Sequence, residues 1–196
     1  MRRGVRLEAV TVAWNAVEAL VGAVVGIATG SVAMTGFGLD SGIEIVAAGL
    51  VLTRLRRAMK SREVNDAREK LALRGIAVTF IALAVYLFID GSINLAGHLH
   101  PKSSWAGIAV SATALVVMPA LAVAKRRTAK AIGSALLLSE AAESMLCAWM
   151  AFAVLAAITI DRTTGQAWVD PVAGFVIAGF ALREAHEAWQ GEPDED

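Results

Sequence analysis

The 196-residue sequence is poor in cysteine and in charged residues. It has one cysteine, Cys147, so an intramolecular disulfide is impossible. Neither charge is in excess, because 18 basic residues balance 18 acidic ones, and this balance favours neither a nucleic-acid partner nor an acidic tail. Charged residues make up 18 % of the chain and hydrophobic residues 57 %, with a mean hydropathy of +0.60. This composition excludes an ordinary soluble domain.

Apolar stretches, each about as long as a bilayer core requires, recur along the chain between charged or Gly/Pro-containing segments. They predict an all-α integral membrane protein with six transmembrane helices. We expect spans at residues 9–29, 32–53, 75–95, 105–124, 131–160 and 168–188. The last span differs from the others, because charged residues make its end amphipathic rather than hydrophobic. Residues 1–196 are expected to form a single transmembrane domain without a cytoplasmic C-terminal domain.

Basic residues are distributed unevenly between the two ends of these spans. Sixteen of the 18 lie before the first span, between the second and third, between the fourth and fifth, or at the end of the sixth. Only Lys102 and Arg162 fall on the other side. Because Lys and Arg are retained in the cytoplasm, both termini are expected to be cytoplasmic, which requires an even number of spans.

Acidic residues lie inside the expected spans, where a charge costs roughly 2.5 to 3.5 kcal/mol on insertion scales and is usually kept for function. Asp40 and Glu44 are one helical turn apart in the second span, and Glu143 and Cys147 repeat this spacing in the fifth. Counting residues from the cytoplasmic end of each span places the two pairs at similar depths. The spacing predicts a four-group metal site near the bilayer centre.

Other polar residues in the spans are expected to support this site as hydrogen-bond partners or as a proton relay; they are Asn15, Glu18, Ser41, Asp90, Glu140 and Ser144. No Lys or Arg lies in the central parts of the first, second, third or fifth spans, so the sequence predicts no internal counter-charge. The acids should therefore be protonated or bind a cation, and a transport site alternates between these two conditions. Cys147 is either an apolar filler or, as its position one turn after Glu143 favours, a ligand.

Two segments resemble the signatures of the cation diffusion facilitator, or cation efflux, family. SVAMTGFGLDSGIE, from Ser31, resembles the second-helix signature, and SALLLSEAAESMLC, from Ser134, resembles the fifth-helix signature. The two segments align with each other at a constant offset of 103 residues. Asn15 and Glu18 in the first span, and the WVDP sequence at the start of the last, also resemble the family. The resemblance implies a six-helix fold with Asp40, Glu44, Glu143 and Cys147 on metal-binding positions.

The same resemblance implies a transporter rather than an enzyme, exporting a divalent metal from the cytoplasm in exchange for protons, with no permanently bound cofactor. Carboxylates combined with a thiolate suit a transition metal better than Mg²⁺ or Ca²⁺. Zinc is favoured, and Fe²⁺, Mn²⁺ or Co²⁺ stay open. The expected setting is a homodimer held by membrane helices in the bilayer of a bacterial inner membrane. His98 and His100, in an outer loop, could collect or release metal, although two loop histidines are weak evidence.

Two other classes of function stay open at this point. An intramembrane enzyme could use Asp and Glu as acid and base, but a catalytic pair needs one acid from each helix, whereas this chain has two layered pairs. A proton channel or a non-transporting membrane scaffold is the other class. Metal binding would separate both from a metal transporter.

Two features of the sequence predict structural devices. A small-xxx-small ridge on the first span suits close helix packing; it consists of Gly22, Gly26 and Gly30. Asp170-Pro171 is expected to be an N-cap followed by proline in the first turn of the last helix.

Overall fold

The computed structural model of the protein describes residues 2–59, 66–97, 101–102, 104–133 and 135–190, and its regular structure is helical throughout these residues. The six helices are α1 (Arg2–Thr29), α2 (Val32–Met59), α3 (Asp66–Gly97), α4 (Trp105–Ile132), α5 (Ala135–Thr164) and α6 (Val169–Gln190). A helix satisfies its own backbone hydrogen bonds, which is the requirement that a lipid environment imposes. The all-α fold predicted from the sequence is confirmed.

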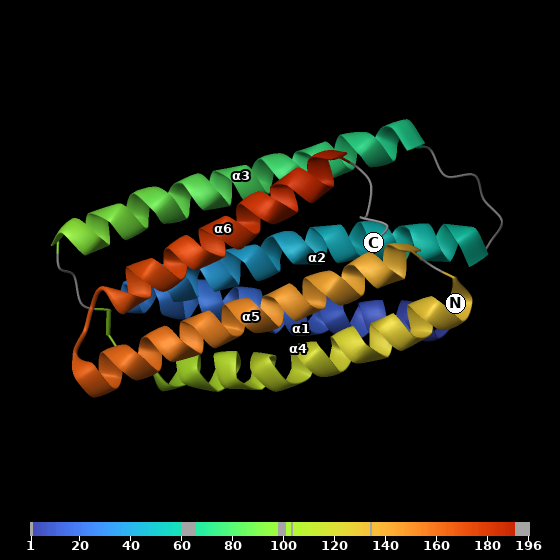
Figure 1. Cartoon of the computed structure of the whole chain (residues 1–196). Coiled ribbons are helices and arrows are strands. Elements are labelled where there is room, and N and C mark those ends of the chain that lie inside the picture. Colours follow the sequence, from blue (N-terminus) through green and yellow to red (C-terminus); the bar gives the residue numbers. More distant parts are fainter. Residues whose placement is uncertain (1, 60–65, 98–100, 103, 134, 191–196) are drawn as a thin grey trace.

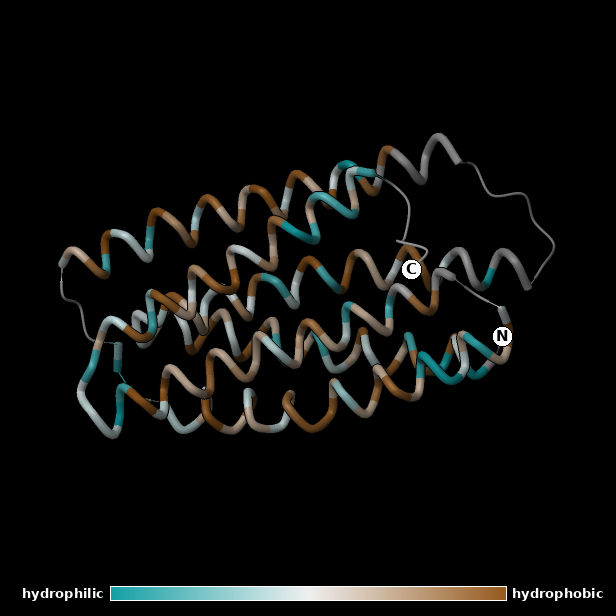
Figure 2. The backbone as a smooth tube through the Cα atoms, viewed as in Figure 1, coloured by the Kyte–Doolittle hydropathy of each residue, from teal (hydrophilic) through white to brown (hydrophobic). Residues whose placement is uncertain are grey.

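The outer surface of the bundle is apolar. Leu20, Ile27 and Val116 are among the large hydrophobic side chains that point outward. Figure 2 shows hydrophobic residues along the central lengths of the helices and hydrophilic ones gathered near one end. An exterior of this kind suits contact with lipid.

Five helices, α1 to α5, contain a segment long and apolar enough to cross a membrane. The shorter α6 does not meet that composition, because every 18-residue stretch of it contains more than two charged residues. This composition agrees with the amphipathic end expected of the sixth span.

The helices run lengthwise beside one another, with close pairing of α1 with α2, α4 with α5, and α3 with α6 (Figure 1). The start of α1 and the end of α6 lie at the same end of the bundle, which we call the terminal end. This arrangement agrees with an even number of crossings. That the terminal end faces the cytoplasm stays a prediction from the distribution of basic residues.

The boundary between the fourth and fifth spans differs from the expected one. The fifth span was expected to begin at Ala131, but α4 continues to Ile132 and α5 begins at Ala135. Gly133 ends α4 in the left-handed conformation, with φ of 64°, and its N–H donates to the Ala129 carbonyl. The shift brings Glu143 about one turn closer to the start of its helix.

The backbones of α1 and α2 approach each other at glycines. A Cβ atom at Gly22 would lie 2.6 Å from the Gly38 Cα, and one at Gly26 would lie 2.4 Å from the Thr35 N. Two members of the expected ridge therefore pack as predicted. The third, Gly30, does not, because it forms the turn between the helices with φ of 73°.

Asp170 caps a different helix from the one expected. It lies in the first turn of α6, but its carboxylate accepts hydrogen bonds from the Ser31 hydroxyl at 2.5 Å and the Val32 N–H at 2.7 Å. The start of α2 would otherwise have unsatisfied N–H groups, and a carboxylate there also interacts favourably with the helix dipole. The interpretation of Asp170 as the cap of its own helix is therefore wrong; it ties α6 to α2.

We expect Asp170→Ala to lower the free energy of unfolding by about 1 to 2 kcal/mol, because it removes a buried cap from α2. Asp170→Asn should cost less, since one acceptor oxygen remains. Thermal unfolding in detergent, followed by circular dichroism, would measure both. Equal stability of Asp170→Ala and the parent would contradict this role.

Candidate functional site

The buried face of α1 carries a line of polar residues. Glu8, Thr11, Asn15 and Glu18 recur at helical spacing, and all four are buried in the bundle. Glu8 was not singled out from the sequence, although its position two turns before Asn15 on the same helix face was a signal that could have identified it. α1 therefore provides buried polar groups along roughly three of its helical turns.

Glu18 joins α1 to both helices that carry the expected ligands. Its carboxylate accepts hydrogen bonds from the Trp14 Nε1 at 2.5 Å, the Ser41 hydroxyl at 3.4 Å and the Cys147 thiol at 3.7 Å. Cys147 is 0 % exposed. In this conformation Cys147 thus meets a carboxylate of α1, and the supporting roles expected of Glu18 and Ser41 stay predictions compatible with these contacts.

Glu44 is held by the amide of Asn15, whose Nδ2 donates to the Glu44 Oε2 at 2.9 Å. The Glu44 side chain is only partly buried. The contact fixes the orientation of one expected ligand from α1, so the two helices that pack through glycines also share the polar contacts of the site.

Asp40 is the most isolated acid of the site. It is 1 % exposed, and among the residues that the structure describes neither of its carboxylate oxygens has a hydrogen-bond partner. Coulombic repulsion from Glu184 and Glu18 acts on it. A buried carboxylate without a partner is costly, so this group requires a proton or a cation.

Glu143 of α5 is partly buried, and Coulombic repulsion acts on it from Glu140, Glu184 and Glu44. Ser144, beside it, donates its hydroxyl to the Glu140 carbonyl of its own helix. Within the described residues, no three His, Cys, Asp or Glu side chains converge closely enough to hold an ion. The structure thus brings the expected ligands into one electrostatically connected region but does not close them into a four-group cage.

A buried lysine corrects the expectation that the bundle has no internal counter-charge. Lys125 was assigned to a loop, but α4 continues through it, and its side chain is 0 % exposed. Its Nζ lies 3.1 Å from a Glu140 carboxylate oxygen and 3.2 Å from one of Glu8. The expected role of Glu140 in support of the site must therefore include this ion pair. Lys125 lies two turns after the buried Met118, so the periodicity of α4 could have predicted its burial.

Among the described residues, the Asp90 carboxylate accepts hydrogen bonds from its own helix. It is partly buried towards the end of α3, and its carboxylate accepts from the Asn94 amide at 3.2 Å and the Tyr86 hydroxyl at 3.4 Å, both on its own helix. Its role in a proton relay stays a prediction. The expectation for His98 and His100 falls outside the described residues.

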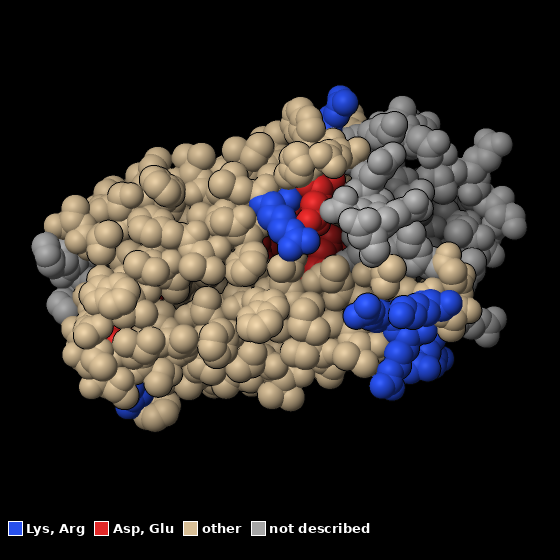
Figure 3. Space-filling model, in the orientation of Figure 1, with Lys and Arg blue, Asp and Glu red and all other residues tan. Residues whose placement is uncertain are grey.

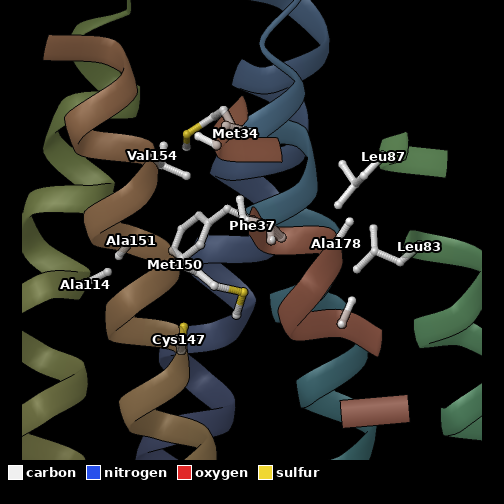
Figure 4. Close-up of a cluster of buried hydrophobic side chains, with 14 of the residues drawn as sticks. Met34, Phe37, Leu83, Leu87, Ala114, Cys147, Met150, Ala151, Val154 and Ala178 are labelled. Carbon is white, nitrogen blue, oxygen red and sulfur yellow. The ribbon is translucent and has the colours of Figure 1, made fainter. Parts of the chain in front are cut away.

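The two ends of the bundle differ in how they cover the acids. Beyond Cys147, away from the terminal end, the interior is filled by Met34, Phe37, Met150 and Val154, all fully buried or nearly so (Figure 4). Towards the terminal end, Figure 3 shows Asp and Glu atoms recessed in the surface beside Lys or Arg atoms. Apolar side chains thus close off the acids on the side away from the terminal end.

These features define a multi-pass membrane protein with an ionisable cluster inside its helix bundle. The chain matches the model of the cation efflux transmembrane domain over residues 9–188. The match covers most of the chain, so the protein belongs to the cation efflux family, and the resemblance seen in the sequence is confirmed. It is accordingly a transporter of metal cations, from a family of transporters rather than of enzymes. No curated protein matches the chain.

Proposed function

We propose that this protein exports a divalent transition metal from the cytoplasm in exchange for protons, and that zinc is the preferred cargo. The observation that carries the proposal is Asp40, a fully buried carboxylate without a hydrogen-bond partner in the described part of the chain. Such a group is stable when it is protonated or when it binds a cation. Alternation between those two conditions is what proton-coupled metal transport requires.

Asp40 and Glu44 of α2, with Glu143 and Cys147 of α5, are the proposed ligands. Three carboxylates and a thiol offer both oxygen and sulfur, a mixture that suits Zn²⁺ and related transition metals better than Mg²⁺. In the structure the Cys147 thiol contacts Glu18 and Glu44 is held by Asn15. Metal binding would therefore draw the thiol away from Glu18 and bring α2 and α5 closer together.

Proton coupling follows from competition for the same oxygen atoms. Asp40 repels Glu44, Glu44 repels Glu143, and other acids of the cluster repel Asp40. Protons taken up by the metal-free site would relieve this repulsion and so stabilise it. In this proposal ions enter from the terminal end, which the distribution of basic residues predicts to be cytoplasmic. The apolar layer around Phe37 blocks the opposite direction.

The setting of the protein is part of the proposal. We place it in a bacterial inner membrane, as a homodimer that contacts its second copy through membrane helices. It needs no permanent cofactor, because the metal is its cargo.

Zinc calorimetry on the purified full chain tests the site. Asp40→Ala and Glu143→Ala are each expected to weaken zinc binding at least 10-fold, because each removes one of few anionic ligands. Asp161→Ala, on α5 far from the cluster, is the control and should bind like the parent. Reconstitution into vesicles supplies the second readout, in which zinc flux should rise when an opposing pH gradient is imposed. Unchanged binding in both site variants, or flux indifferent to the gradient, would overturn the proposal.

A further inference from the structure

Glu184 lies on the face of α6 that packs against α2. That buried face also contains Gly174, Ile177 and Ala181, at helical spacing from Glu184. A Cβ at Gly174 would lie 2.6 Å from the Val32 Cγ1. α6 thus contacts α2 at Gly174, which lies on the same face of the helix as Glu184.

The register between the two helices sets the depth of Glu184. α2 and α6 run in the same direction, because both begin where Asp170 bonds to the start of α2. A Cβ at Gly36 would lie 3.4 Å from the Ile177 Cγ2, so these two residues are level. Two turns further along each helix, Glu184 is level with Ile43, between Asp40 and Glu44.

Glu184 shares the unusual environment of Asp40. It is 9 % exposed, and its Oε1 has no hydrogen-bond partner among the described residues. Coulombic repulsion from Glu184 acts on Asp40, Glu44 and Glu143. Asp40 and Glu184 are thus buried carboxylates on neighbouring helices that repel each other and have unsatisfied oxygens. A cation bound between them would stabilise both.

Neighbouring charges on α6 lie on the exposed side of Glu184. Arg183 and Glu187 act on it electrostatically, but they bond to each other at 2.7 Å on the exposed face of the helix. Glu140 of α5 adds further repulsion. A proton or a bound cation would compensate Glu184 on the side that faces α2.

We propose that Glu184 contacts the transported cation, so that α6 joins α2 and α5 as a helix that binds the cargo. The inference rests on the proposed function, since it extends the same site. A carboxylate on a third helix adds an oxygen ligand beside Asp40. It also makes the position of α6 depend on whether the cargo is bound.

The test compares Glu184→Gln with Asp40→Asn, their double variant, and Glu187→Gln as the matched control one turn along the same helix. Zinc affinity is measured by calorimetry on the full chain in detergent. Glu184→Gln and Asp40→Asn should each weaken zinc binding at least 10-fold, and the double variant should lose less than the product of the single losses, because both side chains bind one ion. Glu187→Gln should change the affinity less than 2-fold.

Thermal unfolding with and without zinc separates a ligand from a structural residue. Glu184→Gln should leave the metal-free protein as stable as the parent or more so, because it removes a repelling carboxylate, while it reduces the stabilisation that zinc provides. Parent-like zinc affinity in Glu184→Gln with a loss in Asp40→Asn would overturn this inference and leave the proposed function standing. Parent-like affinity in both would overturn both. Independent, multiplicative losses would overturn the sharing of one ion by Asp40 and Glu184.

Discussion

Lys125→Met is expected to lower the free energy of unfolding by about 3 to 5 kcal/mol, which is the usual cost of removing one partner from a buried ion pair. The Lys125 ammonium lies between Glu8 of α1 and Glu140 of α5, and all three side chains are buried. Without the ammonium, two carboxylates face each other in the interior with no positive partner. In a chain of this length the apparent Tm should fall by about 10 °C, measured by thermal unfolding in detergent.

Two comparisons separate the effect of losing the ion pair from the effect of changing the packing of the lysine side chain. Lys130→Met, in the exposed last turn of α4, should leave the apparent Tm almost unchanged. Adding Glu8→Gln and Glu140→Gln to Lys125→Met should recover most of the lost stability, because the buried charges are then removed together. If Lys125→Met is as stable as Lys130→Met, the buried ion pair does not hold these helices together.

The second large effect is expected at Gly38, where a single methyl group should separate α1 from α2. A Cβ there would lie 2.2 Å from the Ala23 N and 2.5 Å from the Gly22 carbonyl carbon, which are backbone atoms that cannot rotate away. Gly38→Ala should therefore cost about 3 kcal/mol, at the upper end of the range for overpacked interiors. It should also reduce metal binding, because the same two helices share the Asn15–Glu44 and Glu18–Ser41 contacts.

Gly49→Ala is the matched control on the same helix. Nothing lies within 4 Å of a Cβ at Gly49, so this substitution should be neutral or stabilise α2 by up to about 1 kcal/mol through helix propensity. Replacing glycine by alanine is thus expected to destabilise the protein at Gly38 but not at Gly49, on the same helix. Chemical unfolding in mixed micelles and zinc calorimetry would measure both effects. Similar stabilities for the two variants would show that the close approach of α1 and α2 does not limit stability.

The helices and the acids of the site were predictable because their signals are local. A lipid-facing helix must be apolar along its whole length, so each span is readable from its own residues, and Asp40, Glu44 and Glu143 stand out as exceptions within apolar stretches. The family resemblance also depends on local spacing in α2 and α5, and the match over residues 9–188 confirms it. The end of α4 was less predictable, since a helix that leaves the bilayer can continue in its charged segment beyond the apolar stretch, as it does through Lys125 to Ile132.

What the sequence determined by itself is therefore the class of protein, the six helices and the acids placed in the spans, because lipid constrains each helix separately. Only the tertiary structure decided which polar groups meet. It paired Lys125 with Glu8 and Glu140, brought Cys147 to Glu18, placed the Asp170 carboxylate at the start of another helix, and set Glu184 level with the acids of α2. These contacts join residues far apart in the chain, and they depend on how closely helices approach and in which register they pack, which no single helix specifies.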